Sequence, residues 1–286
     1  MSLLQIFGGE LEKIRLQKLL FLLTQGQEKK SYDFIPFRFG CYSFSANADL
    51  TAMVRKGILS ESSTHFSRMD KIDYLQLISG SDRNQLMKVT KLYGGLSVID
   101  LMKYTYINFP YWATKSEKAE SILSKKELQN VKSSITQSRE TVLFTIGYEG
   151  ISLEEYFNRL IKNDVKVLVD VRNNPLSMKY GFSKSQLKQC CESLGIQYLH
   201  FPEVGIKSEQ RQYLSSQSDY DQLFSSYRKN NLTKTKNTQT SLLHLLQVHQ
   251  RIALTCFEAN ICQCHRKHLA EAIELLPGFD YEVKHI

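Results

Sequence analysis

The apolar run VKVLVDVR, which begins at Val165, is the feature that most limits how this chain can fold. Apolar side chains in consecutive positions leave no polar face for solvent, as expected for a strand buried on both faces of a parallel sheet. VLFTIGYEG, from Val142, and IQYLHFPEVG, from Ile196, are strand candidates on either side of it. Three such runs predict a buried sheet in the second half of the chain.

Helix-start patterns separate these three runs. Ser152 with Glu155, and Ser183 with Gln186, both have the spacing of a capping box, in which a hydroxyl and an acidic or amide side chain satisfy the first backbone N–H groups of a helix. The order strand, helix, strand, helix, strand favours parallel pairing through helical crossovers. The fold class that we predict is therefore α/β, a Rossmann-like parallel sheet with helices on both faces.

A fourth strand candidate leads into the most reactive stretch of the chain, RIALTCFEANICQCHRKHLAEAI, which spans Arg251 to Ile273. It is typical of a buried strand, a short loop and an amphipathic helix. Thiols, a carboxylate, an imidazole and a guanidinium fall within eleven residues of that loop: Cys256, Glu258, Cys262, Cys264, His265 and Arg266. An ordinary loop has little use for such a mixture, so we expect a functional site here.

Parallel strands end at one edge of a sheet, where ligands bind in open α/β folds. The residues expected to bind an anionic ligand at this edge are Gly147, Tyr148, Glu149, Gly150, Arg172, Ser177 and Arg266. The residues expected to carry chemistry are Asp170, Glu258, Cys256, Cys264 and His265. We assign Arg172 and Arg266 as anion clamps, Glu258 or Asp170 as general base, Cys256 or Cys264 as nucleophile or metal ligand, and His265 as proton donor.

Other interpretations of this stretch assign different roles to the cysteines. A tyrosine-phosphatase loop needs an arginine six positions after the cysteine, and Cys262 stands there instead. Zinc or iron on Cys256, Glu258, Cys264 and His265 is an alternative, but paired C-x2-C motifs are missing, so we predict no cofactor. In a purely structural interpretation Cys256 is a small buried apolar side chain and Arg172 pairs with Glu258.

Charge and composition limit the classes of partner that this protein is expected to bind. The net charge of +8 makes nucleic acid, DNA above all, and other phosphate-bearing ligands plausible partners. Residues 207–241 are polar and partly basic, which suits a mobile surface segment or, alternatively, a basic lid over a polyanion. Six cysteines without a disulfide-like spacing, no long apolar run and no signal-peptide pattern favour a cytoplasmic protein with reduced thiols and no membrane contact.

The first half of the chain is predicted to be mostly helical. We expect helices over 11–24, 46–56 and 82–108, an aromatic loop or short extended piece over 31–43, and a strand or hairpin over 65–78. Helix, loop, helix and β wing is the order of a winged helix-turn-helix. A polar stretch over 115–139 suits a solvated helix or a linker, which gives a winged-helix-like domain over 1–138 and an α/β domain over 139–286.

Two sets of motifs resemble known families. Residues 141–286 resemble the bacterial domain-of-unknown-function family 488, through the motifs IGYEG, VDVRNNPLS, LGIQYLHFPEVG and LTCFEANICQCHR. This resemblance implies a Rossmann-like domain but no agreed reaction. KIRLQKLLFLL followed by FGCYS resembles the Panacea group, with Cys41 in place of that group's proline. This second resemblance implies a fold more than a function.

These observations give two functional hypotheses. In the first, the C-terminal half binds or processes a phosphate-bearing ligand, such as a nucleotide or a nucleic-acid end, in a setting such as genome defence or DNA modification. In the second, the protein is a non-enzymatic DNA-binding regulator that senses a small anion or redox state. The sequence leaves open whether the protein is an enzyme.

Overall fold

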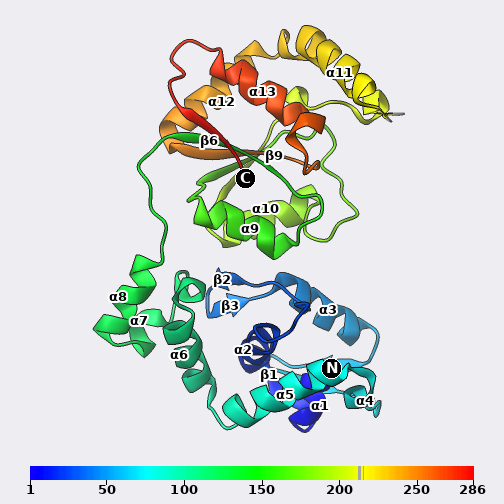
Figure 1. Ribbon diagram of the computed structural model, residues 1–286, viewed down its shortest axis with the longest axis vertical. Coiled ribbons are helices and arrows are strands. Elements are labelled where there is room, and N and C mark those ends of the chain that lie inside the picture. The colour runs from blue at the N-terminus through cyan, green and yellow to red at the C-terminus, as the bar shows by residue number, and fades with distance from the viewer. Residues whose placement is uncertain (212–213, 215) are drawn as a thin grey trace. The chain divides into compact units, whose positions relative to one another are not determined.

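The chain forms two compact units, Met1–Ile135 and Thr136–Ile286 (Figure 1). The structure, a computed structural model, describes residues 1–211, 214 and 216–286. Among these residues, no helix combines the length and the apolar character that a membrane span requires.

The N-terminal unit combines helices with two small antiparallel sheets. Its helices are α1 (Ser2–Ile6), α2 (Lys13–Thr24), α3 (Phe44–Arg55), α4 (Tyr74–Leu77), α5 (Gly80–Tyr93), α6 (Val98–Asn108), η1 (Pro110–Ala113), α7 (Ala119–Ile122) and α8 (Lys125–Ser133). Its strands are β1 (Glu10–Glu12), β2 (Ile35–Phe37), β3 (Gly40–Tyr42), β4 (Leu59–Glu61) and β5 (His65–Arg68). One sheet has the order β1-β5-β4, and β2 pairs with β3.

Local chemistry explains where several of these helices begin. Ser43, Ser79 and Ser97 each accept a hydrogen bond from a backbone N–H in the first turn of α3, α5 and α6. Ser124 and Glu127 form a complete capping box at α8. The apolar face of α2 lies at the centre of the unit, where Phe21 makes edge contacts with three aromatic rings, those of Phe34, Phe109 and Trp112.

Two expectations for the first half need correction. The stretch over 65–78 is not a hairpin by itself: only His65–Arg68 is a strand, which pairs with β1 and β4, and Tyr74–Leu77 is helical. The helix expected over 82–108 is two helices, separated at Gly94 and Gly95. Over the polar stretch 115–139 the structure agrees with the helix alternative, because the stretch contains α7 and α8, although Val131 of α8 is buried in a core cluster.

The C-terminal unit is the predicted α/β fold. Its strands are β6 (Val142–Gly147), β7 (Val167–Asp170), β8 (Gln197–His200), β9 (Arg251–Cys256) and β10 (Glu282–His285). They form one parallel sheet with the order β10-β6-β9-β7-β8. Every residue of β6, β7 and β9 is buried, which agrees with the continuous apolar runs in the sequence.

Helices cover both faces of this sheet (Figure 1). α9 (Leu153–Lys162) and α10 (Lys184–Ser193) lie on one face, and α12 (Lys236–His249) and α13 (His265–Glu274) lie on the other. The chain passes from β6 through β7 to β8 in one direction, then returns to place β9 between β6 and β7, and ends with β10 beyond β6. The winding reverses beside β9, so the carboxyl end of β9 lies where open α/β folds bind ligands.

Two expectations for the second half also need correction. Residues 207–241 are not a mobile surface excursion over their described part: they contain α11 (Gln217–Ser226), a π-helical turn (Tyr227–Leu232) and the start of α12. Phe224, Tyr227 and Leu232 are buried in the same core cluster as the sheet residues. Residues 212, 213 and 215 of this segment lie outside the described residues.

The expected capping box at α10 is also wrong. Ser183 precedes the helix as predicted, but its side chain makes no cap hydrogen bond. Its hydroxyl instead donates to the carbonyl of Ser177 and accepts from the N–H of that residue, which ties the loop after β7 to the start of α10. At α9 the expected cap is present, since Ser152 accepts from the N–H of Glu155.

Candidate functional site

The site lies where three neighbouring strands end together. β9 lies between β6 and β7, with Gly147 in register with Cys256 and Asp170 in register with Thr255. The loops after these strands therefore meet at one edge of the sheet, as the sequence predicted. Most of the expected site residues follow or end these three strands, so the topology brings them into one neighbourhood.

Asp170 and Arg172 form a buried ion pair at this edge. Arg172 Nε donates to Asp170 Oδ1 at 2.8 Å and Nη2 donates to Oδ2 at 2.5 Å. The hydroxyl of Tyr198 also donates to Asp170 Oδ2, at 2.6 Å. Burial lowers the pKa of Arg172, but the Asp170 carboxylate outweighs burial and holds that pKa above its ordinary value. The guanidinium is therefore a fixed cation whose charge Asp170 neutralises.

The remaining N–H groups of Arg172 are also committed to the protein. Nη1 donates to the hydroxyl of Tyr148 at 2.7 Å and to the carbonyl of Phe182 at 2.9 Å. Tyr148 is stacked on Phe182, with ring centroids 4.2 Å apart. Arg172 thus joins the loops after β6 and β7, and the Glu258 pairing considered from the sequence does not occur.

Arg266 is engaged in a similar way with the backbone. Its Nη1 donates to the carbonyl of Glu258 at 2.5 Å and its Nη2 donates to the carbonyl of Ala259 at 3.3 Å. These bonds fix the loop between β9 and α13. The Nη groups of Arg172 and Arg266 each have an acceptor within the protein, and Arg266, whose Nε is buried without a partner among the described residues, does not line the pocket described below.

Arg211 is the cation that the sequence reasoning missed. It ends η3 (Ser208–Arg211), and its Nη1 pairs with Glu258 Oε1 at short range. Its Nη2 lies 2.8 Å from His265 Nδ1 and 3.9 Å from Cys256 Sγ. Its Nε–H is buried and has no acceptor within the described part of the chain. No sequence signal marked Arg211 beyond its place in the basic segment after β8.

The cysteine cluster, defined here as Cys256, Glu258, Cys264 and His265, surrounds this guanidinium. Cys256 ends β9, Cys264 precedes α13 as its N-cap and His265 is the first residue of α13. The donor atoms of the two cysteines and the histidine all lie within 4.8 Å of one another, and all three residues are buried. Glu258 Oε2 lies 3.1 Å from Cys256 Sγ.

The two thiols of the cluster are electrostatically different. Burial raises the pKa of Cys256, but the hydrogen bond from Cys264, the His265 ring and the Arg211 guanidinium outweigh burial and bring that pKa well below its usual range. Burial and the hydrogen bond with Cys256 raise the pKa of Cys264. Burial and the nearby Cys256 also raise the pKa of Glu258. Cys256 is therefore the thiol that deprotonates first, which suits a nucleophile or a metal ligand.

Two glycines allow the loops to pack this closely. A Cβ on Gly147 would lie 2.0 Å from the carbonyl oxygen of Glu258, and a Cβ on Gly205 would lie 2.2 Å from the backbone nitrogen of Asn173. Neither position needs a left-handed backbone, so the requirement is for space alone. Gly147 is therefore a structural member of the site, since it permits the Glu258 backbone to lie against the end of β6.

A cavity of about 290 Å³, called here the strand-end pocket, opens beside the cluster. Its wall consists of Tyr148, Arg172, Asn173, Asn174, Leu176, Ser177, Met178, Ile206, Ser208, Arg211, Cys256 and Phe257. Cys256 and Arg211 thus connect the cysteine cluster to a space large enough for a small ligand. Among the expected residues, Tyr148, Arg172, Ser177 and Cys256 line this pocket.

Glu149 and Gly150 are among the expected residues that do not line this pocket. Glu149 accepts a hydrogen bond from the N–H of Ala259 through Oε2, at 2.9 Å, so it supports the loop that holds the cluster. Gly150 is exposed, and its φ of +76° is that of a turn position. The pocket is therefore built more from the loop after β7 and from η3 than from the glycine turn after β6.

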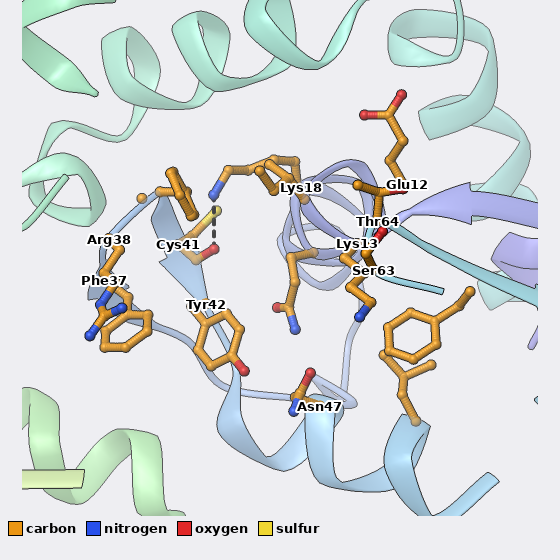
Figure 2. A pocket seen from close by; sticks show the side chains of 16 residues that line it. Glu12, Lys13, Lys18, Phe37, Arg38, Cys41, Tyr42, Asn47, Ser63 and Thr64 are labelled. Carbon is orange, nitrogen blue, oxygen red and sulfur yellow. Dashed lines mark hydrogen bonds between the residues drawn. The ribbon is translucent and has the colours of Figure 1, made fainter. Parts of the chain in front are cut away.

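The N-terminal unit contains a second cavity, of about 460 Å³, between α2, the β2–β3 hairpin, α3 and the loop before β5 (Figure 2). At its edge Lys18 is buried and donates from Nζ to the carbonyl of Cys41 at 2.9 Å. Burial lowers the pKa of this lysine. Phe37, Tyr42 and Arg38 also line the cavity, but no cluster of nucleophilic or acid–base groups comparable to the strand-end site gathers here among the described residues.

The comparisons with known proteins match part of the C-terminal half to one family. Residues 152–273 match the family described as domain of unknown function DUF488. This span runs from the N-cap of α9 into α13 and contains the whole cysteine cluster, so the expected resemblance of this half is confirmed. The match includes none of the N-terminal unit, whose Panacea-like resemblance stays a prediction. No curated protein and no solved structure matches the chain.

Proposed function

We propose that the C-terminal unit binds a small phosphate-bearing ligand of the nucleotide type in the strand-end pocket and processes it there. The observation that carries this proposal is the position of Arg211 on the pocket wall beside Cys256. The Arg211 guanidinium lines the pocket, and a guanidinium can donate to phosphate oxygens. Arg211 thus takes the clamp role that the sequence assigned to Arg172 and Arg266.

The apolar side chains at the rim of the pocket favour a ligand that carries an organic group in addition to its phosphate. Leu176 and Met178 line the pocket and are largely or fully exposed, and Phe257 is 43% exposed. Large apolar side chains gathered beside a polar pocket are typical of ligand or partner sites. A nucleobase could pack on these side chains while its phosphate reaches Arg211, since bases stack on apolar and aromatic surfaces.

A neighbouring cavity of about 440 Å³ would accommodate a further part of the ligand. It shares Asn173 and Ile206 with the strand-end pocket, and Lys207, Lys234 and Glu203 also line it. Two lysines near a phosphate path would attract further phosphates. This favours a nucleotide with more than one phosphate, or the end of a nucleic acid, over an inorganic ion.

The proposal does not extend to DNA binding by the N-terminal unit. α3, the second helix of the expected winged-helix pattern, carries Asp49 and a single basic residue, Arg55, within its bounds. A helix that enters a DNA groove is ordinarily richer in basic side chains. A role in genome defence or DNA modification likewise has no support beyond the nucleotide-type pocket.

The test compares ligands that differ only in the phosphate. We expect calorimetry to detect binding of AMP to the full chain and binding of adenosine that is weaker by about tenfold or more, because a hydrogen bond to a charged group contributes roughly 1.5–3 kcal/mol. Arg211→Gln should abolish the difference between AMP and adenosine. Arg159→Gln, on the exposed face of α9, is the matched control and should leave it unchanged.

Equal affinity for AMP and adenosine in the unaltered chain would refute the phosphate-binding proposal. Processing is tested separately, by chromatography of AMP, ATP and a 5′-phosphorylated dinucleotide after incubation with the protein. Binding without any chemical change in these compounds would favour the alternative of a non-enzymatic sensor.

A further inference from the structure

We infer that Cys256, Glu258, Cys264 and His265 form a binding site for one zinc ion. This inference goes beyond the proposed function, because it concerns a metal and stands on the geometry of the cluster alone. The donor set contains two sulfurs, a nitrogen and a carboxylate oxygen, which are the atom types that bind Zn²⁺ in proteins. The site is formed by the end of β9, the loop after it and the start of α13.

The spacing of the donor atoms suits tetrahedral coordination. Zinc bonds of about 2.3 Å to sulfur and 2.0–2.1 Å to nitrogen place neighbouring donors roughly 3.5–3.8 Å apart. Cys256 Sγ lies 3.7 Å from His265 Nδ1 and 3.1 Å from Glu258 Oε2. The sulfur of Cys264 lies within 4.8 Å of both Cys256 Sγ and the histidine nitrogen. Among the described residues, the donor atoms that all lie within 4.8 Å of one another belong to Cys256, Cys264 and His265, so Glu258 would supply the fourth donor by rotating toward them.

The hydrogen bonds of His265 hold its ring in an orientation that suits a metal ligand. Nε2 lies 3.0 Å from the carbonyl oxygen of Val171, which can only accept, so Nε2 carries the proton. Nδ1 lies 2.8 Å from Arg211 Nη2, which can only donate, so Nδ1 carries the lone pair. This lone pair faces the cysteines. Histidines that bind metals are commonly held in this way, with the other ring N–H bonded to a carbonyl.

Arg211 shows that the cluster attracts positive charge. Its guanidinium contacts Glu258, His265 and Cys256, three of the four donors. Zinc would replace the guanidinium at His265 Nδ1, and the two cysteines would bind as thiolates after releasing their protons to solvent. Two thiolates, a carboxylate and a dication leave one negative charge, which Arg211 would neutralise from beside the site.

The test measures metal on the full chain and uses a cysteine from the same loop as control. We expect about one zinc per chain after purification or after zinc is added to reduced, chelator-treated protein. Cobalt(II) should give thiolate charge-transfer absorption and strong visible bands of tetrahedral coordination. Cys256→Ser and Cys264→Ser should each weaken zinc binding by about tenfold or more. Cys262→Ser should leave it unchanged, because Cys262 is exposed and outside the cluster.

Failure of this inference is distinct from failure of the proposed function. Absence of zinc and of cobalt bands, in unaltered protein whose thiols all react with a thiol reagent after unfolding, would overturn the metal site. Two missing thiols under the same conditions would indicate a disulfide between Cys256 and Cys264 and would also overturn it. The cobalt spectrum of the unaltered chain does not depend on whether the serine variants fold. AMP binding could persist in either case.

Discussion

Single residues at the strand ends have roles that depend on their partners more than on their own chemistry. Asp170 and Arg172 are two positions apart at the end of β7, and each is almost fully buried. The pair connects Tyr198 of β8 on one side to Tyr148 and Phe182 on the other. Buried charges of this kind stabilise a fold only while both members are present.

Replacing Arg172 by methionine should therefore strongly destabilise the C-terminal unit. The Asp170 carboxylate would stay buried without its cation, and removal of one member of a buried pair costs about 3–5 kcal/mol. Chemical denaturation followed by circular dichroism measures the loss. Arg159→Met is the control, since its ion pair with Glu155 is exposed and such a pair contributes only about 0.3–0.5 kcal/mol. Similar losses in the two variants would contradict the structural role of Arg172.

The sequence located the residues of this site better than it assigned their roles. Asp170, Arg172, Glu258 and His265 stood out because ionisable groups followed apolar strands. Their partners could not be predicted, because partner choice depends on side-chain directions across loops. Arg211 is an example of a partner that could not be predicted. It is distant in sequence from Cys256 and is placed beside it by η3, a short helix that no hydrophobic pattern in the sequence predicts.

At the scale of secondary structure, the site depends on how closely the loop after β9 lies against β6. The backbone N–H groups of Tyr148 and Glu149 both donate to the carbonyl of Phe257, at 3.1 and 2.9 Å. The carbonyl of Glu258 lies directly over Gly147. These contacts fix the loop that carries Glu258 toward Cys264.

A methyl group at Gly147 should push this loop away. The Gly147→Ala variant would place a Cβ 2.0 Å from a backbone oxygen, and overpacking typically costs about 1–3 kcal/mol. We expect a lower free energy of unfolding together with faster reaction of Cys256 with a thiol reagent. Gly80→Ala is the control, because Gly80 begins α5 with open space around its Cα and should change stability by about 1 kcal/mol or less. Unchanged stability and thiol reactivity in Gly147→Ala would show that the loop tolerates displacement.

Elements with strong apolar patterns were predicted well, and elements with mixed patterns were not. β6, β7 and β9 are buried throughout, so their sequences are almost uniformly apolar. α11 is different: only Phe224 is buried among its residues, so its sequence resembles a surface loop. β1 has only three residues and precedes α2 directly, which hid it inside the expected helix.

At the scale of the whole molecule, each unit contains a hydrophobic core made of its own residues. The core that contains Leu143, Ile252 and Leu269 consists only of residues from the C-terminal unit, and the one that contains Leu19 and Phe21 consists only of residues from the N-terminal unit. A domain with its own core is expected to fold independently.

The fragment 136–286 should therefore fold when it is expressed alone. We expect a cooperative thermal transition and a dispersed amide spectrum in nuclear magnetic resonance, because the fragment keeps the whole five-stranded sheet and the core on it. The fragment 167–286, which lacks β6, is the comparison and should not fold, since β9 would lose one of its two neighbours. A disordered 136–286 fragment would mean that the N-terminal unit is needed for folding.

The central place of β9 also constrains how the protein is made. During synthesis β6, β7 and β8 leave the ribosome long before β9, which begins only at Arg251. Until β9 arrives, β6 and β7 cannot complete the sheet, and unpaired strand edges with apolar faces are prone to aggregate. Nascent or truncated chains that stop before β9 would therefore be clients for chaperones, and the strand that carries Cys256 would join β6 to β7 only late, shortly before α13 and β10 are added.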